Sequence, residues 1–445
     1  MKLLRSGDGR IVKIIQKNKI SSDIPVRLSS FVYPFEYKNS ILLKNTLTKQ
    51  VFMLSSEEWS ALQTGMLPME VRNELIRLHF LVGSDDNREL SEYNTVLSVL
   101  RIMQKKKHGI ASYTILPTTG CNARCIYCYE EGWLSKTMSP QIADAVVDFI
   151  CRTRQEGKIR LDWFGGEPLC GADTISRICR GVKNRGVDYF STIITNGTLF
   201  TQNMVKEARD LWNLKRAQIS MDGAKEDYKQ RKNYAQPDLY NYETAMRGAE
   251  LLSEAGVEVM MRCNYDAGNL MRVKEFFSDC KDRFGKRNNI SFYMEQLFQY
   301  TSAEENAALF RASAEVSAYL DELGLKSTER IEQRLKTHYC MADSHGKSVI
   351  IDPEGSLHAC EHDIEGKAFG TVFDQTINWL AVGEEIVEEC RDCCFLPDCT
   401  PFRKSRCPLN IAACRTQMAI RTERSLVAML NNSERKANDE SIEEC

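Results

Sequence analysis

The stretch SYTILPTTGCNARCIYCYE, residues 112–130, places a predicted β-strand directly before a loop with three cysteines. Cys121, Cys125 and Cys128 follow this strand in the spacing C-x3-C-x2-C. Three thiolates within eight residues can bind three irons of one [4Fe–4S] cube, whereas Fe–S proteins that only transfer electrons usually supply four cysteines. The missing ligand indicates an iron kept open for a small molecule. The alternative is a closed zinc site, which would need a fourth Cys or His, and none lies within ten residues.

Alternating strand and helix patterns surround this loop. Helix-length segments such as 140–154 and 241–256 separate short apolar runs that recur about every 35 residues. Repeated strand–helix units imply parallel strands with right-handed crossovers. About six such units predict an α/β fold with a partial (β/α)6 barrel, whose active site lies at the C-terminal ends of the strands. The strands are predicted at 112–116, 159–164, 191–195, 217–221, 257–263 and 290–296.

Polar residues and glycines follow these strands at the positions where a site is expected. The second strand ends in WFGGEP, whose two glycines allow a close approach of the backbone to a ligand. A plain β-turn explains this segment equally well, and the Asn-Gly and Asp-Gly dipeptides after the third and fourth strands are also common in turns. The fifth strand carries Arg262 and Asn264. Together, the residues at these strand ends predict one site at the carboxyl edge of the sheet.

The loop of Cys121, Cys125 and Cys128, with the aromatic Tyr127 before its last cysteine, resembles the radical S-adenosylmethionine (SAM) enzymes. In that family SAM chelates the open iron of a [4Fe–4S] cluster, and one electron from the cluster cleaves SAM into methionine and a 5′-deoxyadenosyl radical. The cofactors carry the difficult chemistry, while the protein positions them and excludes water. The resemblance implies SAM-binding residues at the strand ends: Gly165, Gly166, Glu167, Pro168, Thr195, Asn196, Ser220, Asp222 and Arg231.

A second group of cysteines lies near the C-terminus. Of 17 cysteines, eight fall between 340 and 414, and such density in a reducing compartment indicates metal ligands rather than disulfides. The spacing of these cysteines resembles that of the SPASM domain, an extension of radical SAM enzymes that modify peptides and proteins. This domain holds two auxiliary [4Fe–4S] clusters. The pattern departs from the family at Arg403, where a cysteine is expected, and Cys407 is the predicted substitute.

The resemblance divides these cysteines between two clusters. The outer cluster would use Cys390, Cys393, Cys399 and Cys414, and the inner one Cys340, Cys360 and Cys407. The inner cluster then has an open iron, unless Cys394 or one of four nearby histidines supplies a ligand. Histidines in a plain structural loop are the favoured interpretation, and zinc is an alternative for the whole segment because C-x2-C pairs are common in zinc ribbons. The four histidines are His338, His345, His358 and His362.

The remaining segments complete the predicted domain order. Before residue 100, two strand patterns, SFVYPFEY and SILLKNTLTKQVFML, precede two short helical patterns, which predicts a winged-helix-like α+β module. Peptide maturases of the resembled group often bind a precursor peptide on such a module as an added strand. The predicted domains are residues 1–100 for this module, 108–300 for the radical SAM partial barrel, 301–336 for a helical bridge, 337–420 for the SPASM domain and 430–445 for a disordered tail.

Composition excludes some classes of partner. The chain has 59 Lys and Arg against 61 Asp and Glu, so no overall field favours nucleic acid or anionic membranes. No apolar run approaches the roughly 20 residues that span a bilayer. The start MKLLRSGDGR lacks the apolar core of a secretory signal. We therefore expect a cytoplasmic protein without nucleic-acid or membrane partners.

These patterns converge on an expected function. The resemblance implies a radical SAM/SPASM enzyme that matures a ribosomally made precursor peptide (RiPP maturation), with a thioether cross-link as one outcome and epimerisation or C–C cross-linking as others. Its cofactors would be SAM, one SAM-binding [4Fe–4S] cluster and two auxiliary clusters, and its electron donor a protein such as flavodoxin or ferredoxin. The alternatives are side-chain oxidation, as in anaerobic sulfatase maturases, and a non-catalytic, zinc-stabilised peptide-binding regulator. The sequence identifies no catalytic acid or base.

Overall fold

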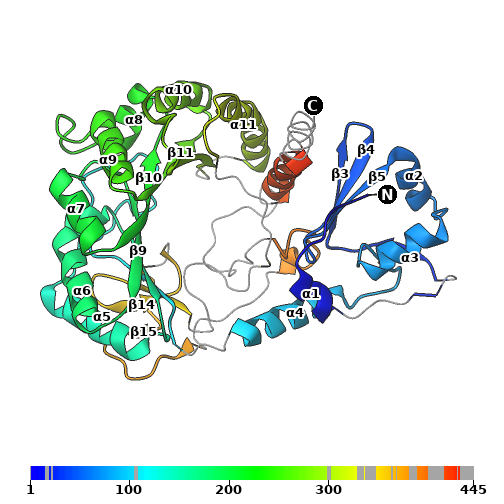
Figure 1. The fold of residues 1–445 in the computed structure, drawn as a ribbon, viewed down its shortest axis with the longest axis horizontal. Helices are drawn as coiled ribbons and strands as arrows, with labels where there is room; N and C mark the ends of the chain where they lie inside the picture. Colours follow the sequence, from blue (N-terminus) through cyan, green and yellow to red (C-terminus); the bar gives the residue numbers. More distant parts are fainter. Residues whose placement is uncertain are drawn as a thin grey trace, which may run out of the picture. The chain divides into compact units, whose positions relative to one another are not determined.

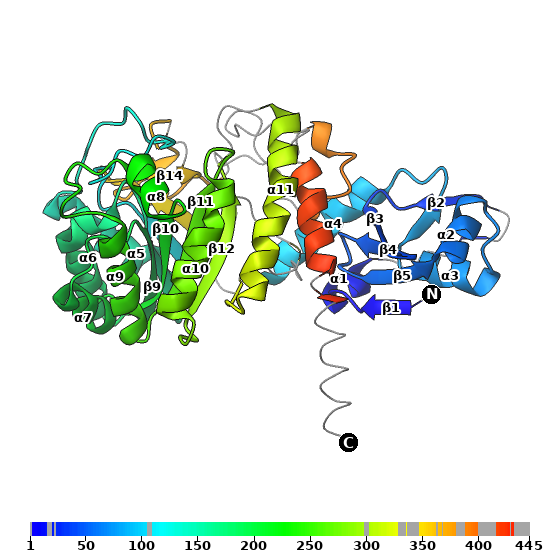
Figure 2. The same cartoon turned by 90° about the horizontal axis from the view of Figure 1, so that it is seen from above.

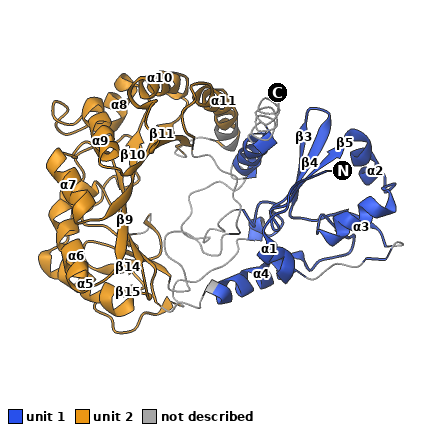
Figure 3. Ribbon diagram, viewed as in Figure 1, with its two compact units in different colours: residues 1–106, 330–339, 385–445 blue, residues 107–329, 340–384 orange. Residues whose placement is uncertain are grey.

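The computed structural model describes residues 2–15, 20–21, 24–104, 109–297, 302–327, 335, 347–361, 364–366, 368–379, 388–398, 415–427 and 429–430. The chain divides into two compact units (Figure 3). Unit 1 contains residues 1–106, 330–339 and 385–445. Unit 2 contains residues 107–329 and 340–384, and therefore the three-cysteine loop. The predicted SPASM segment 337–420 contributes to both units, and the domain boundaries stay a prediction.

Unit 2 is built on a sheet whose first six strands are parallel and follow the chain order. The order is β12-β11-β10-β9-β8-β7, and each neighbouring pair is parallel. Figure 1 shows these strands as a curved sheet with helices along its outer side. The strand–helix prediction is thus confirmed for this part of the chain. The strands are β7 (Ser112–Ile115), β8 (Ile159–Trp163), β9 (Tyr189–Thr195), β10 (Leu214–Met221), β11 (Glu258–Tyr265) and β12 (Ile290–Gln296).

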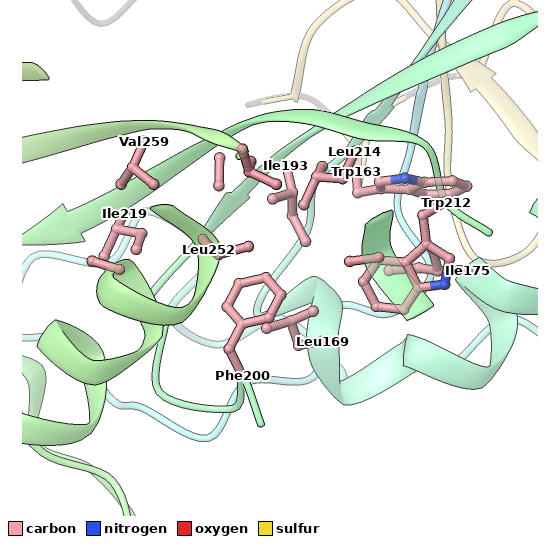
Figure 4. Close-up of a cluster of buried hydrophobic side chains, with 14 of the residues drawn as sticks. Trp163, Leu169, Ile175, Ile193, Phe200, Trp212, Leu214, Ile219, Leu252 and Val259 are labelled. Atoms are coloured by element: carbon pink, nitrogen blue, oxygen red, sulfur yellow. The ribbon is translucent and has the colours of Figure 1, made fainter. Parts of the chain in front are cut away.

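The crossover helices lie along one side of this sheet (Figure 1 and Figure 2), and most of them bury apolar side chains in its core. Helix α5 begins after the N-cap Ser139, whose side chain accepts the backbone N–H of Ile142, and Pro140 fits its first turn. Figure 4 shows Trp163 and Trp212 in the core beneath the strands. The helices are α5 (Pro140–Thr153), α6 (Ala172–Asn184), α7 (Gln202–Asp210), α8 (Lys225–Lys232), α9 (Tyr242–Glu254) and α10 (Val273–Phe284), with short 3-10 turns η1 (Pro168–Gly171) and η2 (Leu270–Arg272).

A hairpin from the C-terminal half of the chain extends the same sheet beyond β7. Strand β13 (Ser348–Ile351) pairs in parallel with β7, and β14 (Ser356–His358) and β15 (Gly370–Thr371) follow in antiparallel order. Gly355 closes the β13–β14 turn at φ +83°, a conformation that glycine adopts without strain. The sequence did not predict this pairing. Of the predicted helical bridge 301–336, the structure describes helix α11 (Ala303–Glu322).

Unit 1 contains the N-terminal module. A four-stranded antiparallel sheet has the order β1-β5-β4-β3, and β2 pairs with β6. Helix α2 begins with a capping box of Ser55 and Glu58. Helix α4 was not predicted. The elements are β1 (Lys2–Arg5), α1 (Gly9–Ile14), β2 (Val26–Leu28), β3 (Val32–Tyr37), β4 (Ser40–Asn45), β5 (Val51–Ser55), α2 (Ser56–Gln63), α3 (Met69–Arg77), β6 (Leu81–Gly83) and α4 (Glu89–Gln104).

The C-terminal cysteine segment packs on the β4–β5 turn within unit 1. The Thr46 hydroxyl donates to the Cys394 carbonyl oxygen at 2.5 Å. Asp398 is buried and accepts from Lys44 at 2.5 Å and from Lys49. Burial opposes ionisation of this carboxyl, yet the two lysines hold its pKa below the ordinary value. Residues 388–390 form a 3-10 turn, η5, and residues 415–427 form a helix.

Several predictions fall on residues outside the described ranges. They concern the C-terminal tail after residue 430 and seven of the cysteines and histidines of the second group. Among the described residues, no helix combines the length and hydropathy needed to cross a membrane. The undescribed ligands are Cys340, Cys399, Cys407 and Cys414, and the undescribed histidines are His338, His345 and His362.

Candidate cofactor site at the three-cysteine loop

The three cysteines lie on the loop that leaves the C-terminal end of β7. All three thiols are partly buried, and the backbone N–H of Ala123 donates to the Cys121 sulfur at 3.4 Å. Burial, with a smaller contribution from Glu167, raises the pKa of Cys121 to about 12. Burial also raises the pKa of Cys125 and Cys128, and each of these thiols feels its neighbours' charge. The loop therefore gathers three sulfur donors that become thiolates only when a cation holds them.

The GGEP segment packs against the backbone of this loop. A Cβ on Gly165 would lie 2.3 Å from the Thr118 carbonyl oxygen, and one on Gly166 would lie 2.5 Å from that of Gly120. The Glu167 N–H donates to the Gly120 carbonyl at 2.9 Å. The glycines were expected to allow a ligand to approach. In the described structure the two glycines have no Cβ, so the cysteine loop itself packs closely against their backbone. This contact fixes the loop against β8.

Glu167 joins two strand ends from a fully buried position. Its carboxylate accepts the Thr195 hydroxyl and the Asn196 N–H, both at 2.7 Å, and the Leu169 N–H at 3.1 Å. Burial raises the pKa of Glu167, and these donors oppose that shift. Pro168 begins the 3-10 turn that Glu167 caps. Glu167 and Thr195 thus direct their polar atoms at each other and hold the ends of β8 and β9 together.

Asn196 connects β9 to the cysteine loop. Its side-chain N–H donates to the Asn122 side-chain oxygen at 2.7 Å, and Asn122 donates in turn to the Thr198 hydroxyl at 3.1 Å. Asn122 lies between the first two cysteines in the sequence. The sequence prediction included Asn196 and missed Asn122, although its position directly after Cys121 was a usable signal.

A buried polar cluster lies behind the second half of the loop. The Tyr127 hydroxyl donates to Asp222 Oδ1 at 2.5 Å, and Asn264 donates to the same oxygen at 3.1 Å. Lys232 Nζ lies 3.2 Å from the Tyr127 hydroxyl and 3.4 Å from Asp222 Oδ2. Asp222 follows β10 and Asn264 belongs to β11, so the cluster brings two strand ends to the loop. Lys232 was not predicted as a site residue.

Two further predicted residues border this cluster. Arg231 forms an ion pair with Asp266 at 2.6 Å, and its guanidinium lies 5.7 Å from the centre of the Tyr127 ring. Its Nε atom is buried and makes no hydrogen bond among the described residues. Ser220 lies half-buried on β10, beside Arg262 of β11. The structure therefore brings the predicted strand-end residues to the same edge of the sheet as the cysteines, while their roles toward SAM stay a prediction.

The second group of cysteines is described only in part. Cys360 follows β14 in unit 2, and its thiol lies 3.7 Å from a Glu361 carboxylate oxygen. His358 is buried on β14, where its Nε2 lies 3.0 Å from Asp352 Oδ2. Cys390 and Cys393 lie in unit 1 and are partly buried. Within the described ranges, no three His, Cys, Asp or Glu side chains converge on one metal-ion position.

The donors of the three-cysteine loop fit a [4Fe–4S] cluster. All three are sulfur ligands, the soft type that Fe–S clusters require, and a cube needs each thiolate to bind a separate iron rather than to converge on one ion. Asp222 Oδ2 and Arg231 Nε are buried polar atoms without a hydrogen-bond partner in the described structure, and both lie at the strand ends beside the loop. For the auxiliary clusters the fit stays a prediction, because four of their seven assigned cysteines lie outside the described residues.

Comparison with known proteins agrees with the resemblance of the three-cysteine loop to the radical SAM enzymes. Residues 115–268 match the family model of the Radical SAM superfamily. An uncharacterised protein of Methanocaldococcus jannaschii is 24% identical over 57% of this chain and 85% of its own length. A probable GTP 3′,8-cyclase of Methanothermobacter marburgensis is 34% identical over 38% of this chain, which spans about half (49%) of the cyclase.

Solved structures extend the likeness of the fold beyond this segment. Native anSMEcpe with bound AdoMet superposes with a TM-score of 0.56 at 17% identity, over 73% of this chain and 99% of that chain. The complex of anSMEcpe with AdoMet and the Cp18Cys peptide gives a TM-score of 0.55 at the same identity and over the same shares of both chains. At this identity the likeness concerns the fold. The match to the Radical SAM superfamily covers residues 115–268 of this chain, with the three-cysteine loop at their start.

Proposed function

We propose that this chain is a radical SAM enzyme that modifies a peptide. The observation that carries the proposal is the loop of Cys121, Cys125 and Cys128 at the C-terminal edge of a parallel sheet, beside the polar ends of β8 to β11. Such an edge is where α/β enzymes bind their ligands. The complex of anSMEcpe with AdoMet and a peptide, a protein of similar fold, supports the peptide as substrate class.

The chain's own residues would bind and orient the cofactors. Cys121, Cys125 and Cys128 would hold the cluster, which when bound with SAM supplies a 5′-deoxyadenosyl radical able to remove a hydrogen atom from the peptide. Glu167 fixes the strand ends through three hydrogen bonds. Asn122 and Asn196 hold the loop to β9. These contacts would keep the reactive centre in one geometry and limit the entry of water.

The sheet of unit 1 would receive the precursor peptide as an added strand. Its β3 edge is poorly suited to this role, because Pro34 has no N–H and the Val32 N–H already donates to the Ser29 carbonyl at 3.0 Å. The opposite edge is the short strand β1, which pairs with β5 through Lys2–Met53 and Leu3–Phe52 and is largely exposed. We therefore propose that a peptide strand adds to this sheet at its β1 edge.

A thioether cross-link is the modification we propose first. Bond formation between a peptide carbon and a cysteine sulfur removes two hydrogen atoms, one as 5′-deoxyadenosine and one as a proton plus an electron. The electron needs an acceptor, and the auxiliary clusters predicted on Cys360, Cys390, Cys393 and their undescribed partners would supply it. An open iron in the inner cluster, predicted from its three cysteines, could also bind the substrate thiolate.

The test combines SAM cleavage with peptide mass. The anaerobically reconstituted chain is incubated with SAM, dithionite and each short peptide encoded beside its gene, with Cys125→Ser as control. We expect 5′-deoxyadenosine from the wild type only, and one peptide that loses about 2 Da. Absence of 5′-deoxyadenosine from the wild type would refute the radical chemistry. Formation of 5′-deoxyadenosine while every peptide keeps both its mass and the configuration of its residues would refute the peptide assignment.

A further inference from the structure

Lys232 is a charged side chain buried directly behind the cysteine loop. It ends helix α8, and only 3% of its surface is exposed. Lysine is almost never fully buried unless it is paired, because removal of an ammonium group from water is costly. Its neighbours along α8, Lys225 and Lys229, are exposed as expected for a polar surface helix. The burial of Lys232 therefore calls for a specific reason.

The Lys232 ammonium contacts the aromatic residue of the cysteine motif. Its Nζ lies 3.2 Å from the Tyr127 hydroxyl and 3.4 Å from Asp222 Oδ2, and 5.8 Å from the centre of the Tyr127 ring. Asp222 is 0% exposed and Asn264 4% exposed, and both also hydrogen-bond the Tyr127 hydroxyl. Three buried partners thus fix Tyr127, one of the two residues between Cys125 and Cys128.

The charge of Lys232 lies behind the cysteine loop. Its ammonium offsets the Asp222 carboxylate there, so removal of the ammonium alone would leave an uncompensated negative charge behind the loop. A positive field in a low-dielectric interior stabilises an added electron, because reduction makes an iron–sulfur cluster more negative.

We propose that Lys232 is a positioning residue for the SAM-binding cluster that also raises its reduction potential. Through Tyr127 it holds the segment between Cys125 and Cys128, and through its charge it favours the reduced cluster. This inference rests on the radical SAM part of the proposed function and is independent of the peptide. It adds a residue that the motif does not contain.

The test is a redox titration of the reconstituted full chain followed by electron paramagnetic resonance. Lys232→Met keeps an unbranched but slightly shorter side chain and removes the charge, and Lys229→Met removes the same charge from the exposed face of the same helix. We expect Lys232→Met to lower the ratio of reduced to oxidised cluster about tenfold at a fixed potential, which corresponds to about 59 mV. Lys229→Met should match the wild type. Tyr127→Phe, which keeps the charge, should shift the potential less than Lys232→Met.

One further variant and the iron content decide the remaining outcomes. If Lys232→Met loses the cluster, Lys232→Arg shows whether the positive charge is needed. Retention of iron by Lys232→Arg at the wild-type potential supports the proposal, and loss of iron in both variants overturns it. An unchanged potential in an iron-replete Lys232→Met chain overturns it as well. A wild-type chain that binds no iron at the three-cysteine loop would refute the proposed function together with this inference, so the two failures are distinguishable.

Discussion

Asp222→Asn tests the buried ion pair behind the cysteine loop. The carboxylate is fully buried and the Lys232 side chain is 4% exposed, with 3.4 Å between Oδ2 and Nζ. The amide oxygen can still accept from Tyr127 and Asn264, but its NH2 group then faces the ammonium and the lysine loses its counter-charge. Removal of one partner from a buried pair typically costs about 3–5 kcal/mol. We expect a loss of that size in the free energy of unfolding.

The assay is urea unfolding under anaerobic conditions, followed by far-UV circular dichroism and by tryptophan fluorescence, since Trp163 and Trp212 are fully buried in unit 2. The double variant Asp222→Asn/Lys232→Met removes both charges and completes a double-mutant cycle. It should be at least about 2 kcal/mol more stable than Asp222→Asn alone, because the uncompensated ammonium is gone. A loss below about 1 kcal/mol in Asp222→Asn, or no recovery in the double variant, would refute the reasoning.

Three further predictions concern other parts of the structure. Gly166→Ala forces a Cβ to within 2.5 Å of two backbone oxygens of the cysteine loop, so it should bind at most half the wild-type iron at that loop, whereas Gly9→Ala, which meets no atom within 4 Å, should keep all of it. Asp398→Asn removes the counter-charge of two buried lysines and should lower the stability of unit 1 by about 3–5 kcal/mol at pH 7. The pKa of Asp398 is lowered in the folded protein, so the stability that its charge contributes is fully present above the ordinary carboxyl value of about 3.9. This stability is lost as pH falls through the lowered pKa. Acid unfolding that is identical in wild type and variant would contradict the prediction. Cys170→Ser should retain the full iron content, since the thiol is exposed and outside the motif, while Cys125→Ser should lose about four irons per chain.

The sheet of unit 2 was predictable because its signals are local. Each strand is a short apolar run followed by a helix-length segment, and the six predicted strands lie within a few residues of their observed bounds. Pairing of β13 with β7 joins residues more than 230 positions apart, and no local pattern encodes it. Helix α4 did carry a signal, since Tyr93, Val96, Leu97 and Leu100 are buried at helical spacing.

The sequence predicted which residues lie at the site better than it predicted which side chains they contact. The strand-end rule placed Glu167, Asn196 and Asp222 at one edge of the sheet, where the structure has them. Their partners could not be predicted, because helix α8 reads KEDYKQRK and gives no sign that Lys232 is buried. Such a burial depends on how α8 packs against the ends of β10 and β11, which is a tertiary property.

The central claim is that the three-cysteine loop binds one SAM-chelating [4Fe–4S] cluster. The most direct measurement is iron and acid-labile sulfide per chain after anaerobic reconstitution, in the wild type and in the triple variant Cys121→Ala, Cys125→Ala and Cys128→Ala. With two auxiliary clusters, the account predicts about 12 irons falling to about 8. About 4 falling to none would keep the claim and remove the auxiliary clusters. An iron content that is unchanged in the triple variant, or zinc with negligible iron in the wild type, would contradict it.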